Sequence, residues 1–167
     1  VLGANDGILS TTSLAIGVAA ANITREPIIL ATIAGLVAGA LSMAAGEYVS
    51  VSSQADIETA DLVREKYELE NTPETELEEL AKIYENRGLT RDLSVEVAKQ
   101  LTHYNALESH ARDELGINEI TQARPFQAAL ASAVSFIVGG LLPLLISIFA
   151  PVKQMITYQY GFSIIFL

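Results

Sequence analysis

Residues 28–71 read IILATIAGLVAGALSMAAGEYVSVSSQADIETADLVREKYELEN. The first half of this stretch is apolar over the length that a helix needs to cross a membrane, whereas the second half is rich in carboxylates. No helix breaker follows Ser50, so we expect the apolar helix to continue and to end near Asn71. The stretch therefore predicts one long helix that leaves a membrane and runs on into water.

The charge of the chain is concentrated in one segment. Of its twenty carboxylates, seventeen lie within residues 51–124, and the formal net charge of the whole chain is -10. Such an acidic segment repels phosphate, which excludes nucleic acid as a partner and favours cations. Because the chain has no cysteine, a bound metal must be held by oxygen, imidazole or thioether groups.

The apolar segments on either side set the domain organisation. We expect residues 1–50 to form two membrane helices, residues 51–124 an acidic helical module, and residues 125–167 a third membrane helix and the start of a fourth. Eight of the ten basic residues lie in the module, which places it in the cytoplasm. The predicted fold is all-α: a multi-pass membrane protein, in contact with lipid, with an inserted cytoplasmic helical metal-binding module.

Helix signals divide the module further. Thr72 is a candidate N-cap with Pro73 at the first helical position, and Gly88 is a candidate terminator. A further helix is expected over residues 92–115. The chain starts without a methionine and stops inside an apolar run, so we expect it to be a fragment.

Two carboxylates lie inside the apolar segments, where ionised groups are costly and usually functional. We place the link at residues 23–27 on the side of the membrane opposite the cytoplasm. Counted from this link at about 1.5 Å per residue, Asp6 lies about 24 Å away along the first helix and Glu47 about 29 Å away along the second. Met43 lies one turn from Glu47 on the same face and adds a thioether. The alternative is that the two acids are interfacial groups and that Met43 only faces lipid.

Carboxylates at helical spacing mark candidate metal ligands in the module. Glu65 and Glu68 are three residues apart, as are Glu76 and Glu79, and like charges at this spacing repel unless a cation lies between them. Such a pair alone is usually a solvated face. Two pairs can nevertheless converge on one site with three polar residues of the next helix: His110, Asp113 and Glu114.

Enzymatic motifs are missing from the sequence. It contains no Glu-x-x-His pair of the di-iron type, no nucleophile elbow, no phosphate-binding glycine loop and no HExxH helix. We therefore expect a protein that is not an enzyme and that holds no tightly bound cofactor.

Nearly the whole chain resembles the vacuolar iron transporter family, in a bacterial form. The motifs that carry this resemblance are GANDG at residues 3–7, GLVAGALSMAAGEYVS at 35–50, QAD at 54–56, ARDELG at 111–116 and PFQAAL at 125–130. Members of that family are dimers with five membrane helices per subunit. They exchange protons for ferrous iron or manganese and carry a cytoplasmic helical metal-binding domain after the second span.

The resemblance implies roles for particular residues. Asp6, Met43 and Glu47 would line the translocation path at the interface of a homodimer. The glutamates of the cytoplasmic site would be Glu65, Glu68, Glu76, Glu79 and Glu114. Where better-known eukaryotic members place a methionine and a further glutamate, this chain has His110 and Ala111, so the ligand set stays open, with Asp113 as an alternative ligand.

Two functional hypotheses follow. The first is a proton-coupled exporter of ferrous iron or manganese (Fe²⁺ or Mn²⁺), in a bacterial inner membrane, in which Asp6 and Glu47 alternate between metal and protons. The second is a membrane-anchored metal buffer or scaffold, in which the acidic module acts alone and the acids in the apolar segments are dispensable.

Overall fold

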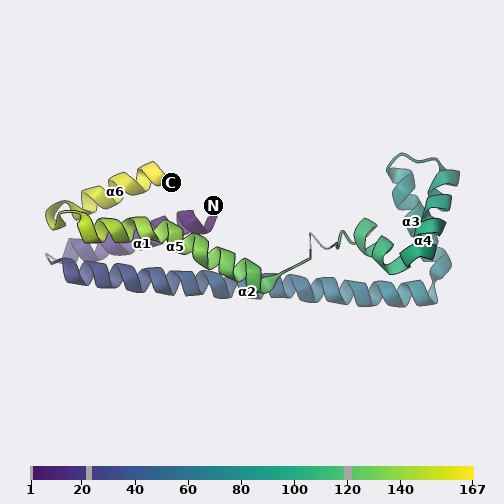
Figure 1. The fold of residues 1–167 in the computed structure, drawn as a ribbon, viewed down its shortest axis with the longest axis horizontal. Coiled ribbons are helices and arrows are strands. Elements are labelled where there is room, and N and C mark those ends of the chain that lie inside the picture. Colours follow the sequence, from purple (N-terminus) through teal and green to yellow (C-terminus); the bar gives the residue numbers. More distant parts are fainter. Residues whose placement is uncertain (1, 22–23, 119–121) are drawn as a thin grey trace. The chain divides into compact units, whose positions relative to one another are not determined.

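The computed structural model describes residues 2–21, 24–118 and 122–167, which form helices and short connecting segments with no strand among them. The long helices are α1 (Leu2–Ala21), α2 (Arg25–Asn71), α4 (Arg91–Asp113) and α5 (Pro125–Phe149). Shorter ones are α3 (Pro73–Asn86), the 3₁₀ turn η1 (Val152–Gln154) and α6 (Met155–Phe166). The all-α prediction is confirmed, as is the prediction of one long helix that ends at Asn71 (Figure 1).

The chain forms two compact units. One contains residues 1–51 and 125–167, and the other contains residues 52–124. We call them the apolar unit and the acidic unit. The helix α2 contributes its first part to the apolar unit and its second part to the acidic unit.

Glycines let α1 and α5 pack backbone against backbone in the apolar unit. A Cβ atom on Gly139 would overlap the carbonyl oxygen of Ala4, and one on Gly7 would overlap that of Phe136. Over Gly35 and Gly39 of α2 the nearest atoms belong instead to side chains, those of Leu14 and Phe136. At these two positions of α2 the missing Cβ therefore makes room for a side chain rather than for another backbone.

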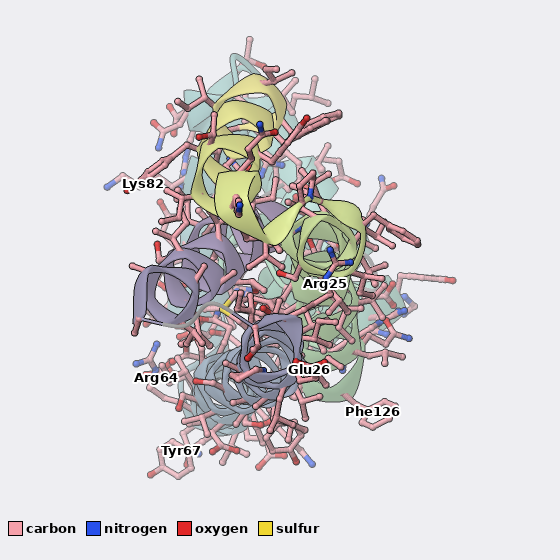
Figure 2. The ribbon with its side chains drawn as sticks, turned by 90° about the vertical axis from the view of Figure 1, so that its left-hand side faces the viewer. Arg25, Glu26, Arg64, Tyr67, Lys82 and Phe126 are labelled. Carbon is pink, nitrogen blue, oxygen red and sulfur yellow. The ribbon has the colours of Figure 1, made fainter. Side chains whose placement is uncertain are left out.

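Buried polar contacts join α2, α5 and α6. Thr32 and Ser147 lie 3.2 Å apart between their hydroxyl oxygens. The Gln159 side chain donates to the Pro143 carbonyl at 2.9 Å and to the Ser147 hydroxyl at 3.0 Å. At the start of α2, the Arg25 guanidinium donates to the carbonyl of Ile148 in α5 and to that of Ala150, directly after α5. Figure 2 labels the Arg25 side chain. Because such groups have no water in a membrane, pairing them with each other fixes the helices.

Two of the helices within the described residues, α2 and α5, are long and apolar enough to cross a membrane. Large apolar side chains on both lie exposed, such as Leu41 at 66% and Leu130 at 56%, which is typical of a surface that meets lipid or a partner. By the same measure α1 is not among the candidate spans, because Asn5, Asp6 and a run of hydroxyl residues lower its hydropathy. Its role as a span stays a prediction.

The acidic unit packs α3 against α4 around a small apolar core of Leu80, Ala81 and Ala98. Pro73 opens α3 as expected, and Gly88 follows it with a positive φ of 103°. The Thr72 hydroxyl makes no cap hydrogen bond and instead donates to the Glu68 carbonyl at 3.0 Å. The helix predicted for residues 92–115 is interrupted at Asn105, where the backbone is extended (φ −162°, ψ 93°).

Candidate metal centre

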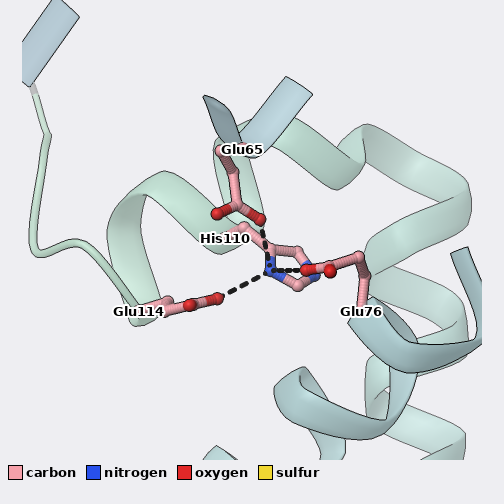
Figure 3. A group of neighbouring side chains, drawn as sticks. All are labelled: Glu65, Glu76, His110 and Glu114. Atoms are coloured by element: carbon pink, nitrogen blue, oxygen red, sulfur yellow. Dashed lines mark hydrogen bonds and ion pairs between the residues drawn. The ribbon is translucent and has the colours of Figure 1, made fainter. Parts of the chain in front are cut away.

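Four side chains from three helices converge in the acidic unit. Glu65 comes from α2, Glu76 from the first turn of α3, and His110 and Glu114 from the end of α4. One possible ligand atom of each lies within 4.8 Å of the others. Figure 3 shows the three carboxylates directed at one ring nitrogen of His110.

Local structure brings these groups together. The turn at Thr72 and Pro73 reverses the chain, so the first turn of α3 returns to the end of α2. The break at Asn105 starts a new helical segment, in which the Asn105 side chain accepts the Glu108 N–H at 3.2 Å. This N-cap redirects the last turns of α4, which carry His110 and Glu114.

The distances around His110 fit a small divalent cation. Its Nδ1 atom lies 2.9 Å from Glu65 Oε1, 3.0 Å from Glu114 Oε2 and 3.8 Å from Glu76 Oε2. Neighbouring ligands of an octahedral metal with bonds of about 2.1 Å are about 3.0 Å apart, and opposite ligands about 4.2 Å. The distances from His110 Nδ1 to Glu65 and Glu114 match neighbouring ligands, and its distance to Glu76 lies between the two values.

Burial makes the group costly without a cation. The His110 side chain is 0% exposed, that of Glu65 2% and that of Glu76 6%, whereas that of Glu114 is 31% exposed. Among the described residues, Glu65 Oε1 and Glu76 Oε2 make no hydrogen bond, and their contacts with His110 Nδ1 are ion pairs only if the imidazole is protonated. Unpaired buried polar atoms of this kind are uncommon in folded proteins, and a bound ion can supply the partner that such atoms lack.

Burial and mutual repulsion change the ionisation of the two innermost acids, both of which lie in the acidic unit. Burial, with the nearby Glu114 carboxylate as the next cause, raises the pKa of Glu65 from 4.5 to about 7. Burial and the charge of Glu79 also raise the pKa of Glu76, although His110 acts in the opposite direction. A bound cation would offset the repulsion between the carboxylates and so lower the pKa of both acids.

The donor set defines the chemistry of the group. Three carboxylate oxygens and one imidazole nitrogen suit borderline first-row divalent metals, while the all-oxygen sets typical of Ca²⁺ and Mg²⁺ lack the nitrogen. The one solvent-facing carboxylate, that of Glu114, gives an ion a way in and out.

Three further predicted ligands lie outside this group. Glu68 is partly exposed and makes an ion pair with Arg64 at 3.8 Å. Glu79 is exposed and lines a surface depression on α3. Both lie close enough to raise the pKa of Glu76 through their charge. The third is Asp113.

Asp113 is not part of this group, and its carboxylate is paired with other side chains. Its carboxylate accepts hydrogen bonds from the Tyr84 hydroxyl at 2.6 Å, from Arg87 at 2.7 Å and from Arg112 at 3.0 Å. Its burial acts to raise its pKa, but the hydrogen bonds from Tyr84 and the two arginines outweigh burial and lower that pKa to about 2. Sequence reasoning did not single out Tyr84 or Arg87; their positions shortly before the glycine terminator gave no signal of this contact.

The residues predicted for a translocation path lie in the apolar unit. Asp6 is half-buried on α1 and accepts a hydrogen bond from the Ser10 hydroxyl at 2.7 Å. Met43 is half-buried on α2, against the cluster of Leu36, Ala40 and Phe136, whereas Glu47 is exposed. Their common role stays a prediction.

Comparison with known proteins identifies the family. The sequence model of the VIT family matches residues 1–167. A vacuolar iron transporter of Acanthamoeba castellanii is 50% identical over 153 residues, which cover 92% of this chain and 56% of that protein. A vacuolar iron transporter of Centaurea cyanus is 35% identical over 156 residues (92% and 64%), and vacuolar iron transporter 1 of Arabidopsis thaliana is 32% identical over 147 residues (87% and 59%).

The chain therefore spans less than two thirds of the length of these relatives. Its whole-length match to the family model and its two apolar helices of spanning length agree with the expected membrane fold. The chain belongs to the VIT family of integral membrane proteins.

Proposed function

We propose that this protein is a transporter that exports divalent transition metal from the cytoplasm, with ferrous iron or manganese as its substrate, and not an enzyme. The observation that carries the proposal is the group of Glu65, Glu76, His110 and Glu114, of which the first three are buried and whose ligand atoms all lie within 4.8 Å of one another. The relatives named as vacuolar iron transporters support iron as the metal. Manganese is included because a set of three oxygens and one nitrogen accepts both ions.

In this proposal the acidic unit lies in the cytoplasm and gathers the ion, and the apolar unit passes it across the membrane. Asp6, Met43 and Glu47 line the path, at the interface of a homodimer. Asp6 and Glu47 exchange the metal for protons, since a carboxylate in a partly apolar site can bind either one. The bacterial inner membrane is the location that we propose on the basis of the sequence.

Metal binding by paired variants tests the centre. Glu76→Gln removes a buried ligand, whereas Glu79→Gln changes an exposed acid on the same helix. We expect Glu76→Gln to weaken Mn²⁺ binding at least about tenfold, since it removes a ligand charge, and Glu79→Gln to weaken it only a few-fold. Isothermal titration of the detergent-solubilised protein measures both.

The proposal would be contradicted by equal, small effects of the two variants, because the acids would then act only as a diffuse negative surface. Full metal binding together with transport that is insensitive to Asp6 and Glu47 would instead favour the second hypothesis, a membrane-anchored metal buffer or scaffold.

A further inference from the structure

The last helical segment of α4 carries two of the four donors of the metal centre and is short. It begins after the break at Asn105 and ends at Asp113, with His110 near its end and Glu114 as its C-cap. Helix ends fray, because their last carbonyls lack partners within the helix. Donors placed there need another contact to stay in position.

Asp113, which is not one of the four donors, supplies such a contact. Its side chain is 8% exposed and binds the Tyr84 hydroxyl at 2.6 Å and the Arg87 guanidinium at 2.7 Å. A second Arg87 nitrogen donates to the Asp113 carbonyl at 3.3 Å, and the guanidinium lies 5.3 Å from the centre of the Tyr84 ring. Arg112 adds a fourth hydrogen bond, within α4 itself, at 3.0 Å.

These contacts join the same two helices that must be aligned for the metal. Tyr84 and Glu76 both lie in α3, and Arg87 is the C-cap of that helix. Charge-assisted hydrogen bonds to a buried carboxylate are short and directional, so they fix one helix end against another more firmly than exposed pairs do. The ion pairs of Arg91 with Glu78 and Glu85, which also join α3 and α4, are exposed on both sides.

We propose that Asp113 is a positioning residue of the metal centre: together with Tyr84 and Arg87 it holds the end of α4 against α3, and so sets His110 and Glu114 at ligand distance from Glu76. The inference rests on the proposed function of that centre. It gives Asp113 a role that differs from metal ligation, the alternative that its place beside Glu114 in the sequence suggests.

Co²⁺ is a suitable probe, because its visible absorption reports coordination geometry as well as binding. The whole chain in detergent is titrated with Co²⁺ as Asp113→Asn, Tyr84→Phe and Glu78→Gln variants, and thermal unfolding of each is recorded without metal. Tyr84→Phe removes one hydrogen bond to Asp113 but keeps every charge and both arginine contacts. It therefore tests how the position of Asp113 affects metal binding while the charge of Asp113 stays the same. Glu78→Gln is the matched control, since it breaks an α3–α4 pair that does not involve Asp113.

We expect Asp113→Asn and Tyr84→Phe each to weaken Co²⁺ binding about tenfold, the usual cost of losing a group that orients a ligand, and to change the absorption band. Glu78→Gln should leave the affinity and the band unchanged. Unchanged binding and band in Tyr84→Phe would overturn the proposal, whatever Asp113→Asn does, since Asp113 would then act by its charge or not at all. An equal loss in Glu78→Gln would also overturn it, by pointing to general loosening of the unit.

A His110→Gln variant separates this inference from the proposed function. If His110→Gln binds Co²⁺ as the unmodified protein does, the centre itself is wrong. If His110→Gln weakens binding while Tyr84→Phe does not, the centre stands and only the positioning role is overturned.

Discussion

At the residue scale, Glu65 couples the stability of the acidic unit to pH. Burial raises its pKa from 4.5 to about 7, so between these two values the folded protein keeps a proton that the unfolded chain has released. Raising the pH through this window therefore lowers the free energy of unfolding. The contribution is complete below about pH 4.5 and is lost above about pH 7.

We expect the metal-free protein to be less stable at pH 8 than at pH 5 by about 2–3 kcal/mol from this group, at about 1.4 kcal/mol per pKa unit. Denaturant unfolding with a chelator present measures the difference. Glu65→Gln should remove most of this dependence, because the amide does not ionise. Glu70→Gln, an exposed position on the same helix, should leave it intact, and a slope unaffected by Glu65→Gln would refute this account.

At the element scale, the interruption of α4 decides where two ligands point. Asn105 caps the second segment through its contact with the Glu108 N–H, and its side-chain amide also donates to the Glu108 carboxylate at 2.8 Å. In an unbroken helix the side chains of His110 and Glu114 would point in a different direction. The kink is thus a requirement of the centre.

We expect Asn105→Ala to lower stability by about 1 kcal/mol, the usual cost of losing an N-cap, and to weaken metal binding because the segment is free to straighten. Metal titration and thermal unfolding check both effects. Gln100→Ala breaks an exposed side-chain pair with Glu96 on the same helix, and it should leave metal binding unchanged. Normal metal affinity in Asn105→Ala would show that the kink is not needed.

The approach of α1 to α5 is a second requirement at this scale. Gly139→Ala would place a methyl group onto the Ala4 carbonyl, so the two helices would have to separate, at a cost of about 1–3 kcal/mol. Gly17→Ala, on α1, meets no atom within 4 Å and should be neutral or slightly stabilising, since alanine favours helix. Thermal unfolding in detergent compares them; equal melting temperatures would argue against the close contact.

At the scale of the whole molecule, an apolar unit and an acidic unit share one chain and one helix, α2. The acidic unit holds a candidate metal centre, and the apolar unit holds carboxylates on helices that are otherwise almost uncharged. A transporter needs both parts, one to select the ion and one to carry it. A buffer needs only the first.

Transport by variants of the apolar unit distinguishes these possibilities. We expect Asp6→Ala to reduce Fe²⁺ uptake into proton-loaded vesicles at least about tenfold relative to the unmodified protein, because removing an ionised group from a membrane path removes a binding step for the cation. Glu26→Gln, an acid at the start of α2 and away from the proposed path, should transport normally. Uptake that is equal in Asp6→Ala and Glu26→Gln would contradict the proposed path.

The sequence alone determined the class of the fold and most helix ends. Helix formation and helix ends depend mainly on neighbouring residues, so their signals can be identified without a structure. The signals here are the apolar runs of spanning length, the proline after Thr72 and the glycine at position 88. The same holds for the acidic composition of residues 51–124, which predicts affinity for cations. The sequence also predicted a set of seven candidate ligands there, because spacing along a helix shows which residues share a face.

Only the tertiary structure decided which of the seven meet. Glu65 and Glu68 have the same local spacing as Glu76 and Glu79, yet one member of each pair turns inward to His110 and the other stays nearer the surface. That choice depends on how α2, α3 and α4 pack and on the break at Asn105, which neither composition nor periodicity encodes. For the same reason the sequence could not show that Glu114 joins the group whereas Asp113 does not. Tyr84 and Arg87, which donate hydrogen bonds to the Asp113 carboxylate, lie more than 25 residues away in the chain.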